Sequence, residues 1–167
     1  MTGLKLPRII FGVIATAALA ECALAYAQLP GRMASHFRAS GAANGWMPKP
    51  AFFAVYAAMI CVSALVGFFA PRSIEGKSSD RINLPNKEYW LAPERRDATF
   101  AFFRKSFAWY GCGLLLMLVL AMGLAIQANF SAPPRMPAGP ILSVIVGFVL
   151  FNVAWVIGLL RHFSGLS

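Results

Sequence analysis

Acidic residues are scarce in this chain of 167 residues. It has six Asp and Glu against 15 Lys and Arg, and 13% of its residues are charged whereas 59% are hydrophobic. A soluble domain has roughly 25% charged and about 45–50% apolar residues. So few charges cannot keep this much apolar surface in water, which indicates an integral membrane protein. At this length, the composition also excludes a large soluble catalytic domain.

Residues typical of metal, redox and nucleophilic chemistry are also few. The three cysteines, Cys22, Cys61 and Cys112, have no C-x-x-C spacing and fall in apolar runs, so we expect buried free thiols. The two histidines, His36 and His162, lie in segments expected on opposite sides of the membrane, which excludes a shared metal or haem. There is no Gly-rich phosphate loop, Ser/His/Asp arrangement or carboxylate pair. We therefore expect no enzymatic activity, no cofactor and no metal site.

Four apolar runs are each long enough to cross a bilayer, which takes about 20 helical residues. They are approximately Ile9–Gln28, Ala51–Ala70, Ser106–Gln127 and Ile141–Leu160. Pro7, Pro50 and Pro140 stand just before three of the runs, where a missing N–H costs least. Pro71 is expected to close the second run. The predicted fold class is all-α, a four-helix integral membrane protein.

The first run also has features of a cleavable signal peptide. Lys5 and Arg8 precede an Ala-rich stretch, and Ala-Tyr-Ala at 25–27 fits a cleavage site. However, Glu21 stands before Cys22, where a lipoprotein site needs a small residue, and it interrupts the apolar run. We expect this segment to be retained as a membrane helix.

The distribution of Lys and Arg predicts the orientation. With both termini cytoplasmic, the inner segments hold 11 of these residues and the outer segments hold four. We therefore predict a multi-pass protein of the inner (cytoplasmic) membrane with cytoplasmic N- and C-termini. Residues 1–70 would form two helices and an ordered extracytoplasmic loop, 71–105 a basic cytoplasmic loop with an interfacial helix, and 106–167 the last two helices. The expected partners are anionic lipid headgroups and other membrane proteins or a second copy, not nucleic acid.

The outer loop Leu29–Lys49 is long for a connection between two helices. Gly41 and the pair Asn44-Gly45 supply the positive-φ positions that tight turns require, and Trp46 suits the membrane interface. We predict a compact loop. The residues expected to contact a ligand or partner there are His36, Phe37, Arg38, Asn44, Trp46 and Lys49.

The same loop contains a set of residues with a distinctive spacing. It consists of Leu29-Pro30, His36-Phe37, Gly41, Gly45-Trp46 and Lys49. The pattern resembles the core of the domain-of-unknown-function family numbered 1648, which is also found at the N-terminus of the sporulation-delaying-protein immunity family of bacterial membrane proteins. The family pattern has Asn and Asp where this chain has Arg38 and Asn44, so the charge of the loop differs. The resemblance covers about residues 9–96.

A second segment, residues 83–96, is similar to a P-N-K-x-Y-W-L-x-P-E-R-R motif of some of these proteins. Its candidate residues are Asn86, Tyr89, Trp90, Glu94, Arg95 and Arg96. Pro93 suits the first turn of a helix, with Glu94 near its positive end. Phe100, Phe103 and Phe107 recur at helical spacing and are expected to face lipid. The neighbouring cations expected at anionic headgroups are Arg95, Arg96, Arg104 and Lys105. The segment is either a basic helix leading into the third span or a docking surface.

One acid, Glu21, lies inside a predicted span, roughly 10 Å below the outer boundary at the helical rise per residue. A carboxyl at such depth faces protein or water. Because Asn152 lies at a similar depth, a Glu21–Asn152 hydrogen bond is our hypothesis, with His36 and Arg38 as rival partners. Glu21 either makes one structural hydrogen bond in its protonated form or acts in ligand sensing or proton coupling.

Two classes of function fit these features. The first, which the family resemblance implies, is a non-enzymatic membrane protein that senses or gives immunity to an extracytoplasmic peptide through Leu29–Lys49. The alternative is an accessory or structural subunit of a larger membrane complex, because a small four-span chain with ridges of small residues suits packing against other helices. A transporter would need more polar or broken helices.

Overall fold

The computed structural model of the protein describes residues 2–165. In chain order the elements are η1 (Thr2–Leu4), α1 (Lys5–Tyr26), β1 (Arg32–Phe37), β2 (Ala43–Pro48), α2 (Lys49–Ala64), η2 (Leu65–Phe69), α3 (Ala70–Glu75), η3 (Ser79–Arg81), α4 (Lys87–Trp90), α5 (Pro93–Ala128) and α6 (Ala138–Ser164). Four helical segments in this part of the chain are long and apolar enough to span a membrane: α1, the continuous segment Lys49–Glu75, α5 and α6. The predicted number and approximate positions of the spans are confirmed.

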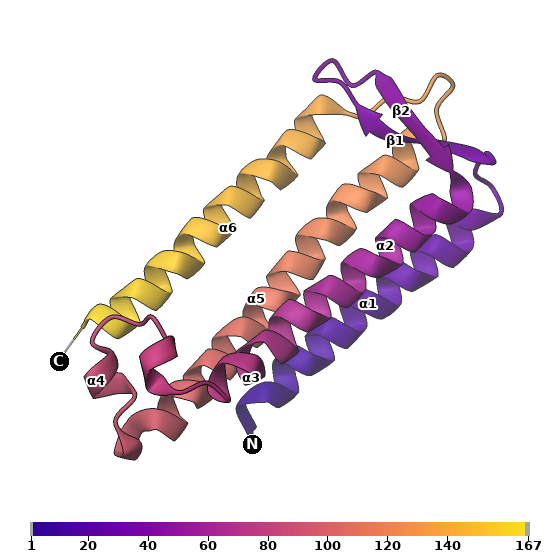
Figure 1. The fold of residues 1–167 in the computed structure, drawn as a ribbon. Coiled ribbons are helices and arrows are strands. Elements are labelled where there is room, and N and C mark those ends of the chain that lie inside the picture. The colour runs from indigo at the N-terminus through magenta and orange to yellow at the C-terminus, as the bar shows by residue number, and fades with distance from the viewer. Residues whose placement is uncertain (1, 166–167) are drawn as a thin grey trace.

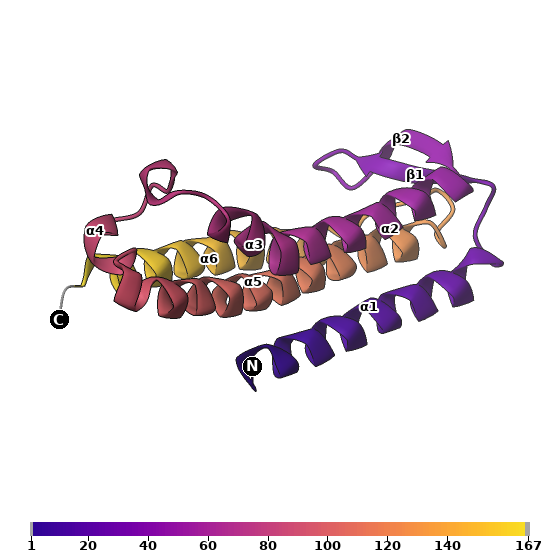
Figure 2. The same ribbon diagram turned by 60° about the horizontal axis from the view of Figure 1, so that its bottom comes forward.

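The long helices are arranged around α5. Helices α1 and α2 pack on one side of α5, and α6 packs on the other (Figure 1). Figure 2 shows α1 as a separate layer beside α2 and α5. Both ends of the described chain lie at one end of the bundle, and the β1–β2 hairpin and the α5–α6 connection lie at the other (Figure 1). We call these the terminal end and the hairpin end.

The segment expected to be a loop contains a β-hairpin, so the all-α prediction is wrong here. Strands β1 and β2 pair antiparallel, with Ala34 opposite Trp46 and an irregularity around His36. The strands are short, and the adjacent Met33 and Ala34 of β1 are both buried, so burial does not alternate along this strand and gives a weak signal in the sequence. Met33, which is fully buried, packs into the core at the ends of the helices.

The second span does not end at Pro71, as the sequence predicted, but continues to Glu75. The turn before Pro71 is a π-helix, η2. Proline has no N–H to donate, and a wider turn allows the helix to pass through it. Within η2, Gly67 meets Gly111 of α5, where an added Cβ on Gly111 would lie 2.7 Å from the Gly67 Cα atom. The two backbones are therefore in direct contact at this crossing.

Two apolar cores stabilise the two ends. The larger core joins α1, α2, α5 and the hairpin and includes Ala18, Ala25, Leu29, Met33, Phe52, Tyr56, Ala125 and Ile126. The smaller core, at the terminal end, packs Phe100 against Ile82 and Leu91. Phe100 is only 1% exposed, and its neighbours Phe103 and Phe107 contact aromatic rings of α6. The expectation that these three rings face lipid is wrong, because the loop folds back over Phe100 and α6 packs on Phe103 and Phe107.

Helix α6 is held on α5 by an aromatic seam. The Tyr110 hydroxyl donates a hydrogen bond to Asn152 Oδ1 at 2.8 Å, and Trp155 Nε1 donates to Ser106 Oγ at 3.0 Å. The ring of Phe151 covers Gly113 so closely that a Cβ there would overlap it. The rest of the α6 surface consists largely of exposed apolar residues, as expected for a face in contact with lipid.

Candidate functional site

One buried side chain, Asn129, fixes the hairpin to the end of α5. Its Oδ1 accepts a hydrogen bond from Ala34 N at 2.7 Å, and its Nδ2 donates to Ala34 O at 2.9 Å. Nδ2 also donates to Ala125 O, in the last turn of α5, at 2.8 Å. The carboxamide therefore pairs with β1 as a neighbouring strand would. It satisfies backbone groups that water cannot reach, since Ala34 is 0% exposed.

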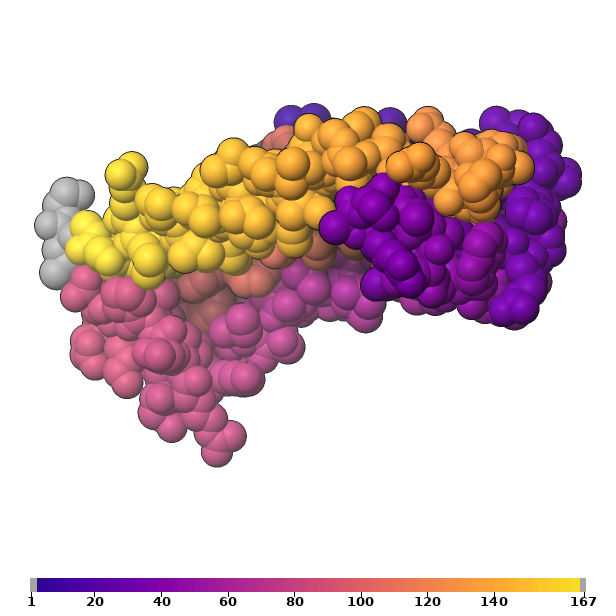
Figure 3. All heavy atoms as spheres, turned by 90° about the horizontal axis from the view of Figure 1, so that it is seen from above, coloured from indigo at the N-terminus to yellow at the C-terminus, as the bar shows by residue number. Residues whose placement is uncertain are grey.

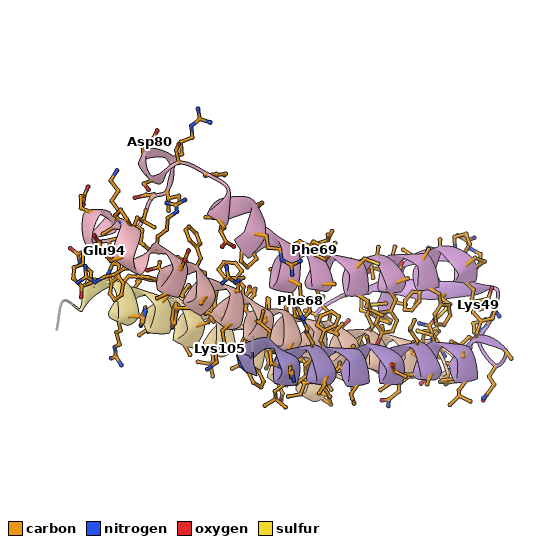
Figure 4. The ribbon with its side chains drawn as sticks, turned by 90° about the horizontal axis from the view of Figure 1, so that it is seen from below. Lys49, Phe68, Phe69, Asp80, Glu94 and Lys105 are labelled. Carbon is orange, nitrogen blue, oxygen red and sulfur yellow. The ribbon has the colours of Figure 1, made fainter. Side chains whose placement is uncertain are left out.

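Lys49 joins the end of α1 to the start of α2. Its Nζ donates hydrogen bonds to Tyr26 O at 2.8 Å and Leu29 O at 2.9 Å, and lies 4.5 Å from the centroid of the Tyr26 ring (Figure 4). A cation at the C-terminal end of a helix interacts favourably with unpaired carbonyl groups. The ammonium group that we expected to contact a ligand is thus engaged within the chain.

The turn of the hairpin is tied to the α5–α6 connection. Gly41 O accepts a hydrogen bond from Met136 N at 2.9 Å, and Ala42 forms an isolated β-bridge with Arg135. Gly41 has a φ of 80°, and a Cβ there would overlap the carbonyl oxygen of Met136. Only glycine meets both requirements, which explains its place in the motif.

An open groove of about 490 Å³ lies between this turn and the first turns of α6. Its hairpin side includes His36, Phe37 and Arg38, and its apolar α6 side is formed by Ile141, Leu142 and Ile145. Figure 3 shows the hairpin and the start of α6 side by side. The groove has the size of a site for a small molecule or a few side chains of a peptide. Of the six loop residues that the sequence singled out, three line it, whereas Asn44, Trp46 and Lys49 do not.

The charge around the groove is of one sign. The chain has no acidic residue between Glu21 and Glu75 and none after Asp97. Arg38 lines the groove, and Arg135 lies in the adjoining connection. The electrostatics of the hairpin end therefore favour an anionic ligand.

His36 is held by its neighbours in the hairpin. Its Nδ1 lies 2.8 Å from Asn44 Oδ1, so in the neutral ring the proton is on Nδ1 and Nε2 is left as an acceptor. Gly45 stands opposite His36, and an added Cβ there would lie 2.8 Å from the His36 Cβ. The motif thus combines residues that shape the hairpin with exposed polar groups at its surface.

Glu21 lies between α1, α2 and α5, but not beside Asn152. The hydroxyl of Tyr56 faces its carboxyl group, although no hydrogen bond of good geometry forms on that hydroxyl among residues 2–165. On the α5 side, a Cβ added to Gly123 would lie 3.1 Å from Glu21 Oε1. The Glu21–Asn152 hypothesis is wrong, because Asn152 is on α6 and its Oδ1 is bound by Tyr110.

The three cysteines are free. Cys112 is buried and Cys22 is half-buried, but Cys61 is exposed, which corrects our expectation for it. A small apolar side chain on a span can face lipid as well as protein.

At the terminal end, the second motif closes on the end of α6. Asn86 Nδ2 and Trp90 Nε1 both donate hydrogen bonds to Phe163 O, at 3.1 and 2.9 Å. Asn86 adopts a left-handed conformation with a φ of 51°. The His162 ring stacks on Phe102, with the ring centroids 3.7 Å apart. We call this contact of Asn86 and Trp90 with Phe163 the C-terminal latch. It satisfies a carbonyl group that the last turn of a helix leaves unpaired.

The remaining residues of this motif lie around the latch. Arg96 donates hydrogen bonds to Ser79 Oγ, Glu75 O and Lys77 O, and the Arg95 guanidinium lies over the Tyr89 ring. Both Arg95 and Arg96, which the sequence placed at lipid headgroups, therefore have partners within the chain.

Five of the six acidic residues of the chain lie between residues 75 and 97, near the second motif. Arg104 forms an ion pair with Glu75 at 2.6 Å. A hydrogen bond with Ser78 lowers the pKa of the exposed Asp80 carboxyl group. Glu94 is exposed in the first turn of α5 (Figure 4), as the sequence predicted.

We expect the double variant Asn86→Gly/Trp90→Phe to loosen the last turn of α6. Glycine keeps the left-handed backbone and phenylalanine keeps an aromatic ring, but both donors to Phe163 O are lost. Leaving a buried carbonyl group unpaired costs about 1–3 kcal/mol. Hydrogen–deuterium exchange of residues 159–164 should become faster, whereas Tyr89→Phe, which removes only an exposed hydroxyl group, should leave it unchanged. Unchanged exchange in the double variant would contradict the latch.

The hairpin with the two helices that flank it matches a known family. Residues 12–60 match the model of a domain of unknown function, DUF1648. This DUF1648 segment begins in α1, includes the whole hairpin and ends in α2, so the second motif (residues 83–96) and the last two spans lie outside it. No curated protein and no solved structure matches the chain.

The structure adds residues that the sequence analysis did not single out. Asn129 and Met136 belong to the α5–α6 connection, which lies outside the DUF1648 segment but completes its hairpin and groove. Tyr56 lies beside Glu21, and Tyr110 donates a hydrogen bond to Asn152. Asn129 could have been noticed in the sequence as a polar residue close behind an apolar run. Its partner could not, because Ala34 lies 95 residues away.

Proposed function

We propose that this protein is a non-enzymatic membrane receptor that binds an acidic, amphipathic peptide on the extracytoplasmic side, in a sensing or immunity role. The observation that carries the proposal is the groove between the hairpin turn and α6. It has an apolar wall on α6, a cationic side chain, Arg38, on the opposite side, and no acidic residue in the segments that form it. An acidic peptide with apolar side chains complements these features.

The rigidity of the hairpin supports this proposal. The hairpin is tied to α5 by Asn129, to the α5–α6 connection through Gly41, and to α1 and α2 by Lys49. A binding surface that is already ordered loses little conformational entropy when a ligand binds. The exposed pair of His36 and Asn44 adds polar groups beside the groove.

Helix α6 connects the groove to the opposite side of the membrane. Its first turns form one wall of the groove, and its last turn ends in the C-terminal latch. In the proposed function, a peptide that shifts the start of α6 also shifts its last turn and so weakens the hydrogen bonds of the C-terminal latch. The signal thus reaches the cytoplasmic motif along one helix rather than through the first two spans.

Photo-crosslinking tests the proposal. A photoreactive amino acid is placed at Leu142, in the groove wall, or at Leu160, which is equally on α6 but at its other end. The protein in nanodiscs is exposed to the peptide fraction of the culture medium, and captured peptides are sequenced and synthesised. We expect capture of an acidic peptide at Leu142 and not at Leu160.

Affinity measurements with the synthesised peptide complete this test. Arg38→Gln should weaken binding at least about tenfold, the effect of losing one charge-assisted hydrogen bond. Arg161→Gln, the control at the terminal end, should leave the dissociation constant unchanged. Equal capture at both positions, or equal affinities of the two variants, would refute the proposal.

A second candidate function is that of an accessory subunit of a membrane complex. It is favoured by α6, because no residue in its most apolar stretch is buried by the rest of the described chain, which leaves this face free for a partner. Purification of the tagged protein from its native membrane in mild detergent, followed by mass spectrometry, should then yield a partner in stoichiometric amount. A protein that purifies alone would count against this candidate.

A further inference from the structure

At the terminal end, a second crevice lies far from the groove. It has a volume of about 400 Å³ and is lined by Gly3, Leu4, Ala101, Phe102, Arg104 and Lys105. Its walls are the residues that lead into α1 and one face of α5. Figure 4 shows Lys105 beside the first turn of α1. A small adjoining hollow shares Leu4 and Arg104 with it and adds Arg8 and Arg72.

The cations of this region outnumber the acids beside them. Arg104 is paired with Glu75, and this is the one ion pair between side chains among residues 2–165. Lys105, Arg8 and Arg72 are exposed and make no ion pair within that part of the chain. The crevice therefore has a net positive charge, next to the apolar surfaces of Leu4 and Phe102.

The depth of the crevice matches that of lipid headgroups. Arg8 directly precedes the apolar run that starts at Ile9, and Lys105 directly precedes the run that starts at Ser106. Since these runs enter the hydrocarbon region, both cations lie at the level where phosphate groups of lipids are found. This holds whichever side of the membrane the terminal end faces.

We propose that this crevice is a binding site for one anionic phospholipid. The headgroup phosphate lies in the crevice against Lys105 and Arg104, with Arg8 and Arg72 in the adjoining hollow, and an acyl chain follows the apolar surface beside Leu4 and Phe102. The site joins the start of α1 to α5, so a bound lipid stabilises the packing of the first span. The proposal is independent of the ligand of the groove.

Native mass spectrometry and thermal unfolding in detergent test this site. With phosphatidylglycerol added, the wild-type protein should retain one lipid and unfold at a higher temperature than with phosphatidylcholine. Lys105→Gln/Arg8→Gln should bind phosphatidylglycerol about 30-fold more weakly, since each cation near a headgroup contributes roughly fivefold. The control Arg81→Gln/Arg161→Gln removes the same charge from exposed positions outside the crevice and should bind like the wild-type protein.

A variant that keeps every charge provides an independent check. Ala101→Trp fills the crevice with an indole ring and should also reduce lipid retention. Equal losses in the two double variants would show a diffuse effect of surface charge and overturn the proposal. Inorganic phosphate that raises the unfolding temperature as much as phosphatidylglycerol would overturn it as well, because the site would then bind a free anion.

Discussion

Gly111→Val should be among the most destabilising single substitutions in this protein. A Cβ at this position would lie 2.7 Å from the Gly67 Cα atom and 3.2 Å from Ser63 O, both on the second span. Neither atom belongs to a flexible side chain, so the two helices must separate. Overpacking of this kind typically costs about 1–3 kcal/mol and occasionally more, and here it acts where small residues allow two membrane helices to approach.

The effect of this substitution is measured by heating the detergent-solubilised protein and following the folded fraction by size-exclusion chromatography. The matched control is Gly158→Val on α6, where an added Cβ meets nothing within 4 Å. We expect Gly111→Val to lower the unfolding temperature strongly and Gly158→Val to leave it nearly unchanged. Equal unfolding temperatures would contradict the close crossing of α5 and the π turn.

Asn129→Ala should release the hairpin from the helices. The substitution leaves the N–H and C=O groups of Ala34 buried without partners, and each such group costs about 1–3 kcal/mol. The loss is concentrated at one place, so the hairpin should open before the helices separate. Hydrogen–deuterium exchange of residues 32–48 should become much faster, and the groove, which the hairpin forms with α6, should lose its shape.

The nearby Gln127→Ala serves as the control for this prediction. Gln127 is exposed, two residues from Asn129 on the same turn of α5, so its removal should not change exchange in the hairpin. Protection of residues 32–48 that persists in Asn129→Ala would show that other contacts hold the hairpin in place.

The sequence predicted those parts of the fold that depend on local composition. Each span is a long apolar run, and Pro50 and Pro93 both lie in the first turn of a helix, as their missing N–H requires. The turn residue Gly41 was also recognised, because its φ is positive as expected, but the prediction for Asn44-Gly45 is wrong, since both residues lie within β2 and neither is among the residues with a positive φ. The pairing of β1 with β2 was not recognised, because each strand has only six residues and its burial depends on the helix ends below it.

The sequence did not predict contacts between segments that are far apart in the chain. Glu21 and Asn152 were matched by depth alone, but depth does not reveal that α6 stands on the far side of α5 from α1. Phe100, Phe103 and Phe107 were assigned to lipid because nothing local indicated that residues 82–91 fold back over Phe100, or that rings of α6 pack on the other two. The groove itself is formed by the DUF1648 segment and a connection about 95 residues later in the chain.

The proposed function requires that the hairpin end, with its groove, faces the outside of the cell. This orientation is tested most directly by labelling single cysteines in intact cells with a maleimide that cannot cross the cytoplasmic membrane. Ser40→Cys, in the hairpin turn, should be labelled in intact cells, and Ser79→Cys, in the loop at the terminal end, only after the membrane is permeabilised. The unmodified chain, whose cysteines all lie within the spans, is the control. Labelling of Ser79→Cys but not of Ser40→Cys in intact cells would contradict the orientation and, with it, a receptor for extracytoplasmic peptides.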